Sequence, residues 1–172
     1  MEILATERLR LRHLHAGDAD FMLNLLNEPA YHRFIGDKGV RTLDEARGFI
    51  RDKIAVSYAN NGFGLYLVEL KASATPLGIC GLVKRDGLDD VDIGFAFREQ
   101  FWGRGYAFEA ASATLDYARD SVGLRRIVAI TALDNQSSIA LLEKLGLKFD
   151  RIIRIPGNER DSRLFVKPLL VE

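Results

Sequence analysis

Two spacings of apolar residues divide the chain into strands and helices. Residues 8–12 alternate arginine with leucine, and this period of two predicts a strand with one buried face. Apolar side chains at three- or four-residue spacing predict three helices, over 18–27, 43–58 and 105–121. Asp134-Asn135 can cap a fourth helix, which Gly146 would end. Apolar runs, several of them rich in β-branched residues, predict further strands over 64–70, 77–83, 91–97, 126–132, 147–155 and 163–167.

Local signals indicate where several of these elements begin and how they pack. Thr42 and Glu45 are spaced as a capping box, in which each side chain binds the backbone amide of the other residue. The helix over 105–121 carries a face of small residues that would let it lie close on a sheet. Residues 30–40 contain two glycines and show no period, so we expect an irregular segment there. The order of elements predicts one mixed α/β domain over residues 1–172.

Charge balance and cysteine content narrow the classes of function. Lysine plus arginine and aspartate plus glutamate both number 24, so the chain lacks the basic excess of a typical duplex-binding domain. Cys80 is the only cysteine, and its apolar neighbours predict a buried, inert thiol. We see no signal peptide and no apolar run near the ~18 residues of a membrane span. We therefore expect a cytoplasmic protein that binds neither nucleic acid nor membrane, with a homodimer as one option for its assembly.

The most informative stretch is a glycine-containing loop between a predicted strand and a predicted helix. It reads Gln100-Phe101-Trp102-Gly103-Arg104-Gly105. The first turn of a helix has unpaired amides and a partial positive charge, and the glycines remove side chains that would keep a diphosphate away. The Gly-Lys-Ser/Thr ending of a Walker loop is absent, and Phe108 stands where a dinucleotide fingerprint needs a third glycine or alanine.

This stretch resembles the acetyl-coenzyme A (acetyl-CoA) loop of the GNAT N-acetyltransferases. Gln100, Gly103 and Gly105 occupy the fixed places of its Gln-x-x-Gly-x-Gly pattern. Residues 134–138 and 142–147 resemble the second half of the same site. Residues 6–12 are typical of the RimJ/RimL-like branch, whose named members acetylate α-amino groups of ribosomal proteins. The resemblance covers nearly the whole chain and implies the GNAT fold, in which helices flank a mixed, mostly antiparallel and splayed central sheet.

The resemblance also implies an acetyl-CoA-dependent N-acetyltransferase, with acetyl-CoA as co-substrate. Backbone groups of residues 95–97 would bind the pantetheine arm as a pseudo-strand in the gap of the splayed sheet. The expected cofactor-binding residues are Phe95, Ala96, Phe97, Gln100, Phe101, Trp102, Gly103, Arg104, Gly105, Tyr106, Ala107, Asn135 and Ser138. The three histidines have no metal-ligand spacing, so no metal is expected.

Catalysis calls for an acid beside the departing thiolate and a base beside the incoming amine. Many family members place a tyrosine four residues beyond the position of Ser138, but this chain has Leu142 there. The resemblance to the RimL-like variant implies that Ser138 takes the place of that acid. Asp92 and Glu69, both on predicted strands, are the candidate bases.

The acceptor is expected to be a primary amine, and the segment over residues 28–41 is expected to shape the pocket that binds it. Glu28, Tyr31, His32 and Phe34 are the candidate substrate-binding residues, and Glu28 is a further candidate base. The aromatic side chains of this segment suggest a partly apolar acceptor. A protein N-terminal α-amine, a polyamine, an amino acid and an antibiotic amine all stay open.

Two interpretations from other classes compete with an enzyme. A non-catalytic acyl-CoA-binding sensor would keep the glycine loop and lack a competent acid and base; Leu142 favours this interpretation and Ser138 argues against it. A nucleic-acid-binding domain has only Arg8, Arg10 and Arg12 in its favour. These arginines alternate with leucines, so we expect them to form the solvent face of a strand.

Overall fold

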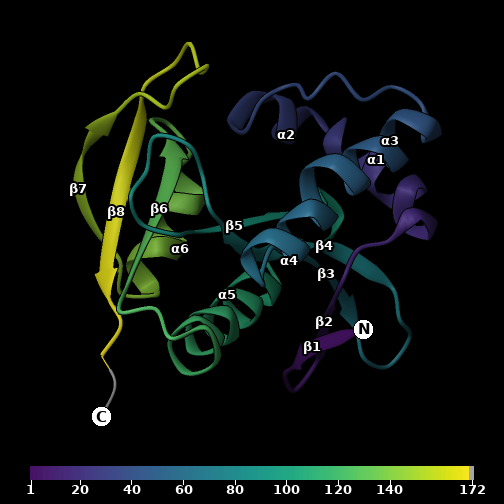
Figure 1. The fold of residues 1–172 in the computed structure, drawn as a ribbon, viewed down its shortest axis with the longest axis horizontal. Coiled ribbons are helices and arrows are strands. Elements are labelled where there is room, and N and C mark those ends of the chain that lie inside the picture. Colours follow the sequence, from purple (N-terminus) through teal and green to yellow (C-terminus); the bar gives the residue numbers. More distant parts are fainter. Residues whose placement is uncertain (171–172) are drawn as a thin grey trace.

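The computed structural model describes residues 1–170, which build one eight-stranded sheet with helices on both faces (Figure 1). The strands are β1 (Glu2–Ala5), β2 (Leu9–Arg12), β3 (Leu65–Leu70), β4 (Pro76–Val83), β5 (Asp92–Phe97), β6 (Arg126–Ala132), β7 (Lys148–Ile153) and β8 (Ser162–Pro168). The α-helices are α1 (Ala19–Leu26), α2 (Pro29–Phe34), α3 (Leu43–Phe49), α4 (Val56–Asn61), α5 (Tyr106–Tyr117) and α6 (Gln136–Lys144). The shorter helical segments are η1 (Ala16–Asp18), η2 (Ile50–Ala55), η3 (Glu99–Phe101) and η4 (Ala118–Val122).

The sheet is antiparallel except at one place near its middle. Its strands lie in the order β1-β2-β3-β4-β5-β6-β8-β7. Only β5 and β6 run parallel, and they share a single register pair, Asp92 with Val128. In Figure 1, β6, β8 and β7 accordingly stand apart from β1 to β4, with β5 between the two groups. This arrangement confirms the mixed, mostly antiparallel and splayed sheet, whereas the single-domain organisation stays a prediction.

Helices bury both faces of the larger part of the sheet. The small residues of α5 pack tightly: Ala110 and Ala111 are fully buried against a core that includes Tyr66 of β3. Leu67, the next residue of β3, belongs to a second core on the opposite face, together with Ile50 and the apolar side of α1. The predicted small-residue face of α5 is therefore confirmed. β3 is therefore buried on both faces, and β4 lies between it and the parallel pair.

Three local features differ from the sequence predictions. Residues 2–5 form β1, a half-exposed edge strand whose four residues do not alternate. Part of the segment expected to be irregular forms α2, because Pro29 stands at the first helical position, where its fixed φ is favourable. Thr42 caps Glu45 as predicted, at 3.1 Å from its amide nitrogen. The Glu45 carboxylate, however, accepts the amide of Arg41 at 3.3 Å, so the expected reciprocal half of the capping box is wrong.

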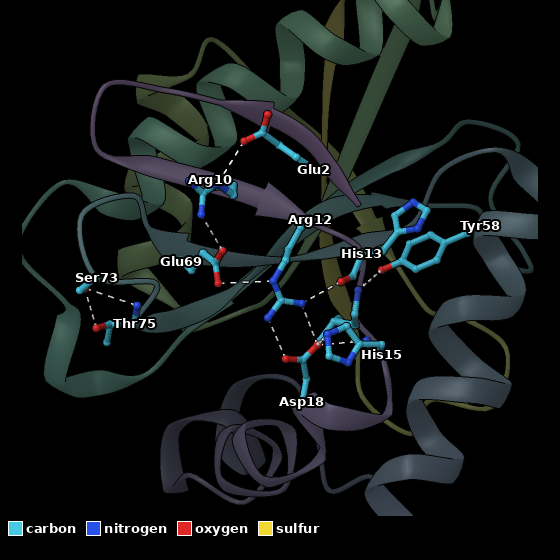
Figure 2. A network of polar contacts seen from close by, with 11 residues as sticks. Glu2, Arg10, Arg12, His13, His15, Asp18, Tyr58, Glu69, Ser73 and Thr75 are labelled. Carbon is cyan, nitrogen blue, oxygen red and sulfur yellow. Dashed lines mark hydrogen bonds and ion pairs between the residues drawn. The ribbon is translucent and has the colours of Figure 1, made fainter.

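The arginines of β2 do not form a simple solvent face. Figure 2 shows Arg10 and Arg12 reaching toward Glu69 on the neighbouring strand β3. Arg10 Nη1 lies 3.2 Å from one oxygen of Glu69, and Arg12 Nε lies 3.4 Å from the other. Arg12 also donates to both carboxylate oxygens of Asp18, each at 2.9 Å. Arg8 is exposed, as expected, but Arg10 and Arg12 are half-buried, because register pairing of β2 with β3 brings a buried carboxylate between their guanidinium groups.

The environment of Asp18 links this network to pH. Burial by itself would raise the pKa of Asp18, but hydrogen bonds from Arg12 and from the backbone amide of His15 outweigh burial. The pKa of Asp18 is therefore below its ordinary value. A carboxylate whose pKa is lower in the folded than in the unfolded state stabilises the fold above its unfolded pKa. That contribution is lost as the pH falls through the folded-state pKa.

We predict that Asp18→Asn lowers the free energy of unfolding at pH 7 by about 1–3 kcal/mol, because Arg12 loses a charged acceptor in a mostly buried site. The wild-type protein should lose stability as the pH falls below about 4, and the variant should lose less. Urea unfolding followed by circular dichroism at pH 7 and pH 3 measures both effects. Asp86→Asn, which changes an exposed carboxylate of a turn, is the matched control. Equal stability losses in the two variants would contradict the assignment.

Candidate active site

The loop between β5 and α5 is shaped by one side-chain hydrogen bond and two left-handed glycines. Trp102 Nε1 donates to the carbonyl oxygen of Phe97 at 2.8 Å, which folds the loop back onto the end of β5. Gly103 and Gly105 have φ angles of +76° and +81°, which residues with a Cβ atom rarely adopt. The backbone therefore requires both glycines. The amide of Glu109 donates to the carbonyl of Gly105 at 3.0 Å, and the amides before it are available to an anion.

A charged contact from the other end of the chain holds this loop in place. Glu109 on α5 accepts hydrogen bonds from Arg8 Nε at 2.7 Å and from the hydroxyl group of Thr6 at 2.5 Å. Arg8 also donates to the carbonyl oxygen of Arg104 at 3.0 Å and lies over the ring of Tyr106. Burial would raise the pKa of Glu109, but the hydrogen bonds from Thr6 and Arg8 outweigh it and lower the pKa. Glu109 is thus ionised at neutral pH, and it fixes the loop to the turn before β2.

A first cavity of about 380 Å³ lies beside this loop. Its walls come from α2, the end of β5, the loop, and the first turns of α5 and α6. The predicted residues that line it are Phe95, Ala96, Phe97, Phe101, Trp102, Gly103, Gly105, Tyr106, Ala107, Asn135 and Ser138. Gln100 and Arg104, which were also predicted to bind the cofactor, lie outside the lining of both cavities described here. Phe108, Leu141 and Lys144 also line this cavity, and none of the three was among the expected cofactor-binding residues.

A second cavity of about 510 Å³ meets the first at a shared set of residues. The shared residues are Tyr31, Phe34, Ile35, Phe95, Ala96, Asn135 and Ser138. Asn135 Oδ1 accepts the backbone amide of Ser138 at 3.3 Å, which confirms the predicted helix cap at the start of α6. We call this set the junction, because a group bound in one cavity would meet a group bound in the other there.

The three candidate bases occupy different surroundings. Asp92 lines the second cavity, is 1% exposed and lies 2.8 Å from Arg85 Nε. Burial raises the pKa of Asp92, while Arg85 opposes that change. Glu28 lines the first cavity, but Arg98 Nε and a backbone amide bind its carboxylate oxygens at 2.9 and 3.0 Å. Glu69 lines neither cavity and is held by the arginines of β2.

Some of the predicted substrate-binding residues line a cavity and others do not. Tyr31 and Phe34 line both cavities, whereas His32 lines neither. The buried Nε2 atom of His32 lies 3.8 Å from a carboxylate oxygen of Asp37, which follows α2 in the chain. One face of α2 therefore points into the site and the other faces away. The sequence could not show this division, because α2 was not predicted as a helix.

Among residues 1–170, no group of three histidine, cysteine, aspartate or glutamate side chains is placed to hold a metal ion. Within the same range, no helix has the length and apolar character needed to cross a membrane.

Comparison with known proteins places this site in a family. Residues 8–148 match the family described as the acetyltransferase (GNAT) domain. The chain belongs to the GNAT family. It is 29% identical over 157 residues to the uncharacterized N-acetyltransferase p20 of Bacillus licheniformis, covering 90% of this chain and 86% of that protein. The GNAT-family acetyltransferase structure from Bacillus anthracis superposes with a TM-score of 0.80 at 27% identity, covering 98% of each chain.

A more distant structure shares the fold. The structure of RimL, a ribosomal L7/L12 alpha-N-protein acetyltransferase in complex with coenzyme A, superposes with a TM-score of 0.84 at 16% identity, over 98% of each chain. GNAT membership makes the chain an acetyl-CoA-dependent acetyltransferase. The left-handed glycines, the available amides at the start of α5 and the adjoining cavity together suit an elongated thioester that carries a diphosphate.

We predict that Gly103→Ala weakens acetyl-CoA binding by about tenfold or more, because a positive φ is costly for alanine and the new methyl group enters the phosphate's space. Gly62→Ala is the matched control, since Gly62 has the same φ of +76° and equally open surroundings at the end of α4. Both variants should lose a similar amount of stability. Isothermal titration of each variant with acetyl-CoA measures the difference, and equal dissociation constants would contradict a phosphate role for the loop.

Proposed function

We propose that this GNAT enzyme transfers the acetyl group of acetyl-CoA directly to a primary amine, with both substrates bound at once. The observation that carries the proposal is the meeting of two cavities at Asn135 and Ser138, one beside the glycine loop and one beside a buried carboxylate. Such a junction holds two reactants at close quarters, and this proximity supplies much of the rate enhancement.

The first cavity suits the acetyl-CoA side of the reaction. The loop amides around Gly103 and Gly105 would bind the diphosphate, and the β6-facing backbone of residues 95–97 would hydrogen-bond the pantetheine arm. That backbone edge has no strand partner in the described chain beyond the single register pair of β5 with β6. The bound thioester supplies an activated acetyl group at the junction.

Ser138 and Asp92 are proposed to handle the protons. Ser138 lies at the junction and would hydrogen-bond the departing thiolate. It would take over the role of the usual acid, because Leu142 stands at the position of that acid and has no proton to donate. Asp92 lines the second cavity, and its raised pKa suits a group that accepts a proton from the amine, directly or through a water molecule. Glu69 is left out of this scheme because it lines neither cavity. Glu28 is left out because both of its carboxylate oxygens are bound, whereas Arg85 binds one oxygen of Asp92.

Direct transfer is favoured over an acetylated cysteine. Cys80 is fully buried in β4, and burial raises the pKa of its thiol to about 12, against an opposing contact with Thr114. The thiol is therefore un-ionised at neutral pH and has no exposed face for a substrate.

Similarity to RimJ/RimL-like enzymes is the basis for proposing a branch of the family and a class of acceptor. The turn and strand over 6–12 resemble RimJ/RimL-like enzymes, and RimL shares the fold, so a protein N-terminal α-amine is one candidate acceptor. The cytoplasmic location and a homodimer stay predictions from the sequence. Leu142, in place of the usual acid tyrosine, favours a non-catalytic acyl-CoA sensor, but Ser138 at the junction argues against it.

The proposed function is tested with acetyl-CoA and a panel of amines, scored by release of free thiol and by mass spectrometry of the acetylated product. The panel contains N-terminal peptides, polyamines, amino acids and aminoglycosides. We expect turnover with at least one class. Tight binding of acetyl-CoA without turnover on any amine would favour the sensor instead.

With the best acceptor from this panel, Ser138→Ala should lower kcat by about 100-fold, at the lower end of the range for general-acid assistance. The affinity for acetyl-CoA should change less, because the loop amides and Asn135 remain. Ser121→Ala, which changes an exposed serine after α5, is the matched control. A folded Ser138→Ala enzyme with full turnover would point to water as the proton source.

We further predict that Asp92 produces the acid limb of the pH profile. Because its pKa is raised, kcat/KM should fall as the pH drops through a value above the ordinary aspartate pKa of about 4. Asp92→Asn should remove that limb and lower turnover. Glu69→Gln, which changes a buried carboxylate outside both cavities, is the matched control and should keep the acid limb. A limb that survives in Asp92→Asn would exclude this aspartate as the base.

A further inference from the structure

The lining of the second cavity carries an excess of positive charge, although the chain as a whole has no net charge. Among its lining residues, Lys38, Lys53 and Arg85 are cationic, and Asp92 is the single acidic residue. The three cations come from separate parts of the chain: the connection between α2 and α3, the segment η2, and the loop after β4. Folding therefore gathers an excess of positive charge around a space where an acceptor amine is proposed to bind.

The two lysines of this group have no compensating carboxylate of their own. Neither Lys38 nor Lys53 forms an ion pair with a carboxylate within residues 1–170, and Asp52, the neighbour of Lys53, pairs with Arg51 instead. The pKa of Lys38 is lowered, first by partial desolvation and then by the positive charges of Arg85 and Lys53. The three cations thus repel one another, and a bound anion would relieve that repulsion.

Neutral polar groups add hydrogen-bonding capacity to the same wall. Thr131 on β6 is 7% exposed, and its hydroxyl is buried without a hydrogen-bond partner in the described chain. A buried hydroxyl that lacks a partner costs free energy unless a ligand or water molecule satisfies it. Tyr31 is also buried, and burial raises the pKa of its hydroxyl to about 12, so it remains a neutral donor at physiological pH.

We propose that the acceptor is a small amine that carries an anionic group, a carboxylate or a phosphate, bound by Lys38, Lys53 and Arg85. The amine of such a molecule extends to the junction beside Ser138. Polyamines and other multiply charged cations are repelled by the same three residues. The aromatic walls formed by Tyr31, Phe34 and Phe49 accommodate an apolar portion between the two ends. This inference rests on the proposed acetyl transfer to an amine, and it narrows the class of acceptor.

The first test compares amines that share a skeleton and differ in charge. The sets are L-phenylalanine, L-phenylalaninamide and phenethylamine; L-alanine and L-alaninamide; and O-phosphoethanolamine and ethanolamine. Spermidine and an acidic N-terminal peptide complete the series. Because hydrogen bonds between charged partners are the strong ones, we expect kcat/KM to be about tenfold or more higher for an anionic member than for its neutral or cationic counterpart. The carboxylate and phosphate sets distinguish the two kinds of anion. Equal or higher values for the amides, for spermidine or for the peptide would overturn the proposal.

The second test removes one charge at a time. Lys38→Met and Lys53→Met should raise the KM for the anionic amine by about tenfold while leaving the KM for its amide and for acetyl-CoA nearly unchanged. Lys148→Met, which removes an exposed lysine of β7 outside both cavities, is the matched control and should change none of the three values. A rise in the KM for acetyl-CoA alone would show that the cations serve the co-substrate and would overturn the proposal.

A binding measurement separates this inference from the proposed function. Calorimetry with coenzyme A present compares N-acetyl-L-phenylalanine with N-acetyl-L-phenylalaninamide, and N-acetyl-O-phosphoethanolamine with N-acetylethanolamine. Selective binding of an acid that is lost in Lys38→Met supports the anion site even where no amine is turned over. Turnover of neutral amines alone would support the proposed acetyl transfer and would exclude the anion site. No binding of either acid overturns the inference.

Discussion

The divergence of β5 from β6 is the constraint on which the rest of the site depends. Two neighbouring parallel strands would ordinarily exchange hydrogen bonds along their length, but these share one register pair, whereas β6 pairs with β8 along its whole length. Backbone amides and carbonyls that a continuous sheet would have consumed are left for another partner. The same divergence brings the start of α6 next to the end of β5, and the two cavities meet at that place. A single missing stretch of strand pairing thus creates both the hydrogen-bonding edge and the space beside it.

The glycine loop shows how a local sequence signal depends on distant residues. Its two left-handed positions follow directly from Gly103 and Gly105, so this part of the site could be predicted from sequence spacing. The contact that fixes the loop could not, because Arg8 and Glu109 are 101 residues apart. Their pairing depends on how β2 lies beside the start of α5. Sequence reasoning placed Arg8 on a solvent face, since alternation reveals which residues are buried and does not reveal which charges meet.

The strand and helix order followed from apolar spacing wherever an element was long or buried on one side. The spacing failed at β1, which is short and half exposed, and at α2, which begins at Pro29 and extends into the segment expected to be irregular. The failure at α2 affected the substrate side, because α2 supplies Tyr31 and Phe34 to the junction. The three cations of the second cavity were also missed. They lie in a connection, a helical segment and a loop that only the folded chain brings together.

The hydrogen bond between the Trp102 indole and the Phe97 carbonyl has a consequence for observing this protein. Trp102 is the only tryptophan of the chain, it is 48% exposed, and it forms part of the first cavity's wall. Its emission therefore originates at one known place, with no other indole to obscure it. Any molecule that displaces water from that wall or disturbs the bond to Phe97 changes the polarity around a single fluorophore. The enzyme consequently carries a built-in optical reporter, through which the arrival and departure of a ligand can be followed in real time without a label.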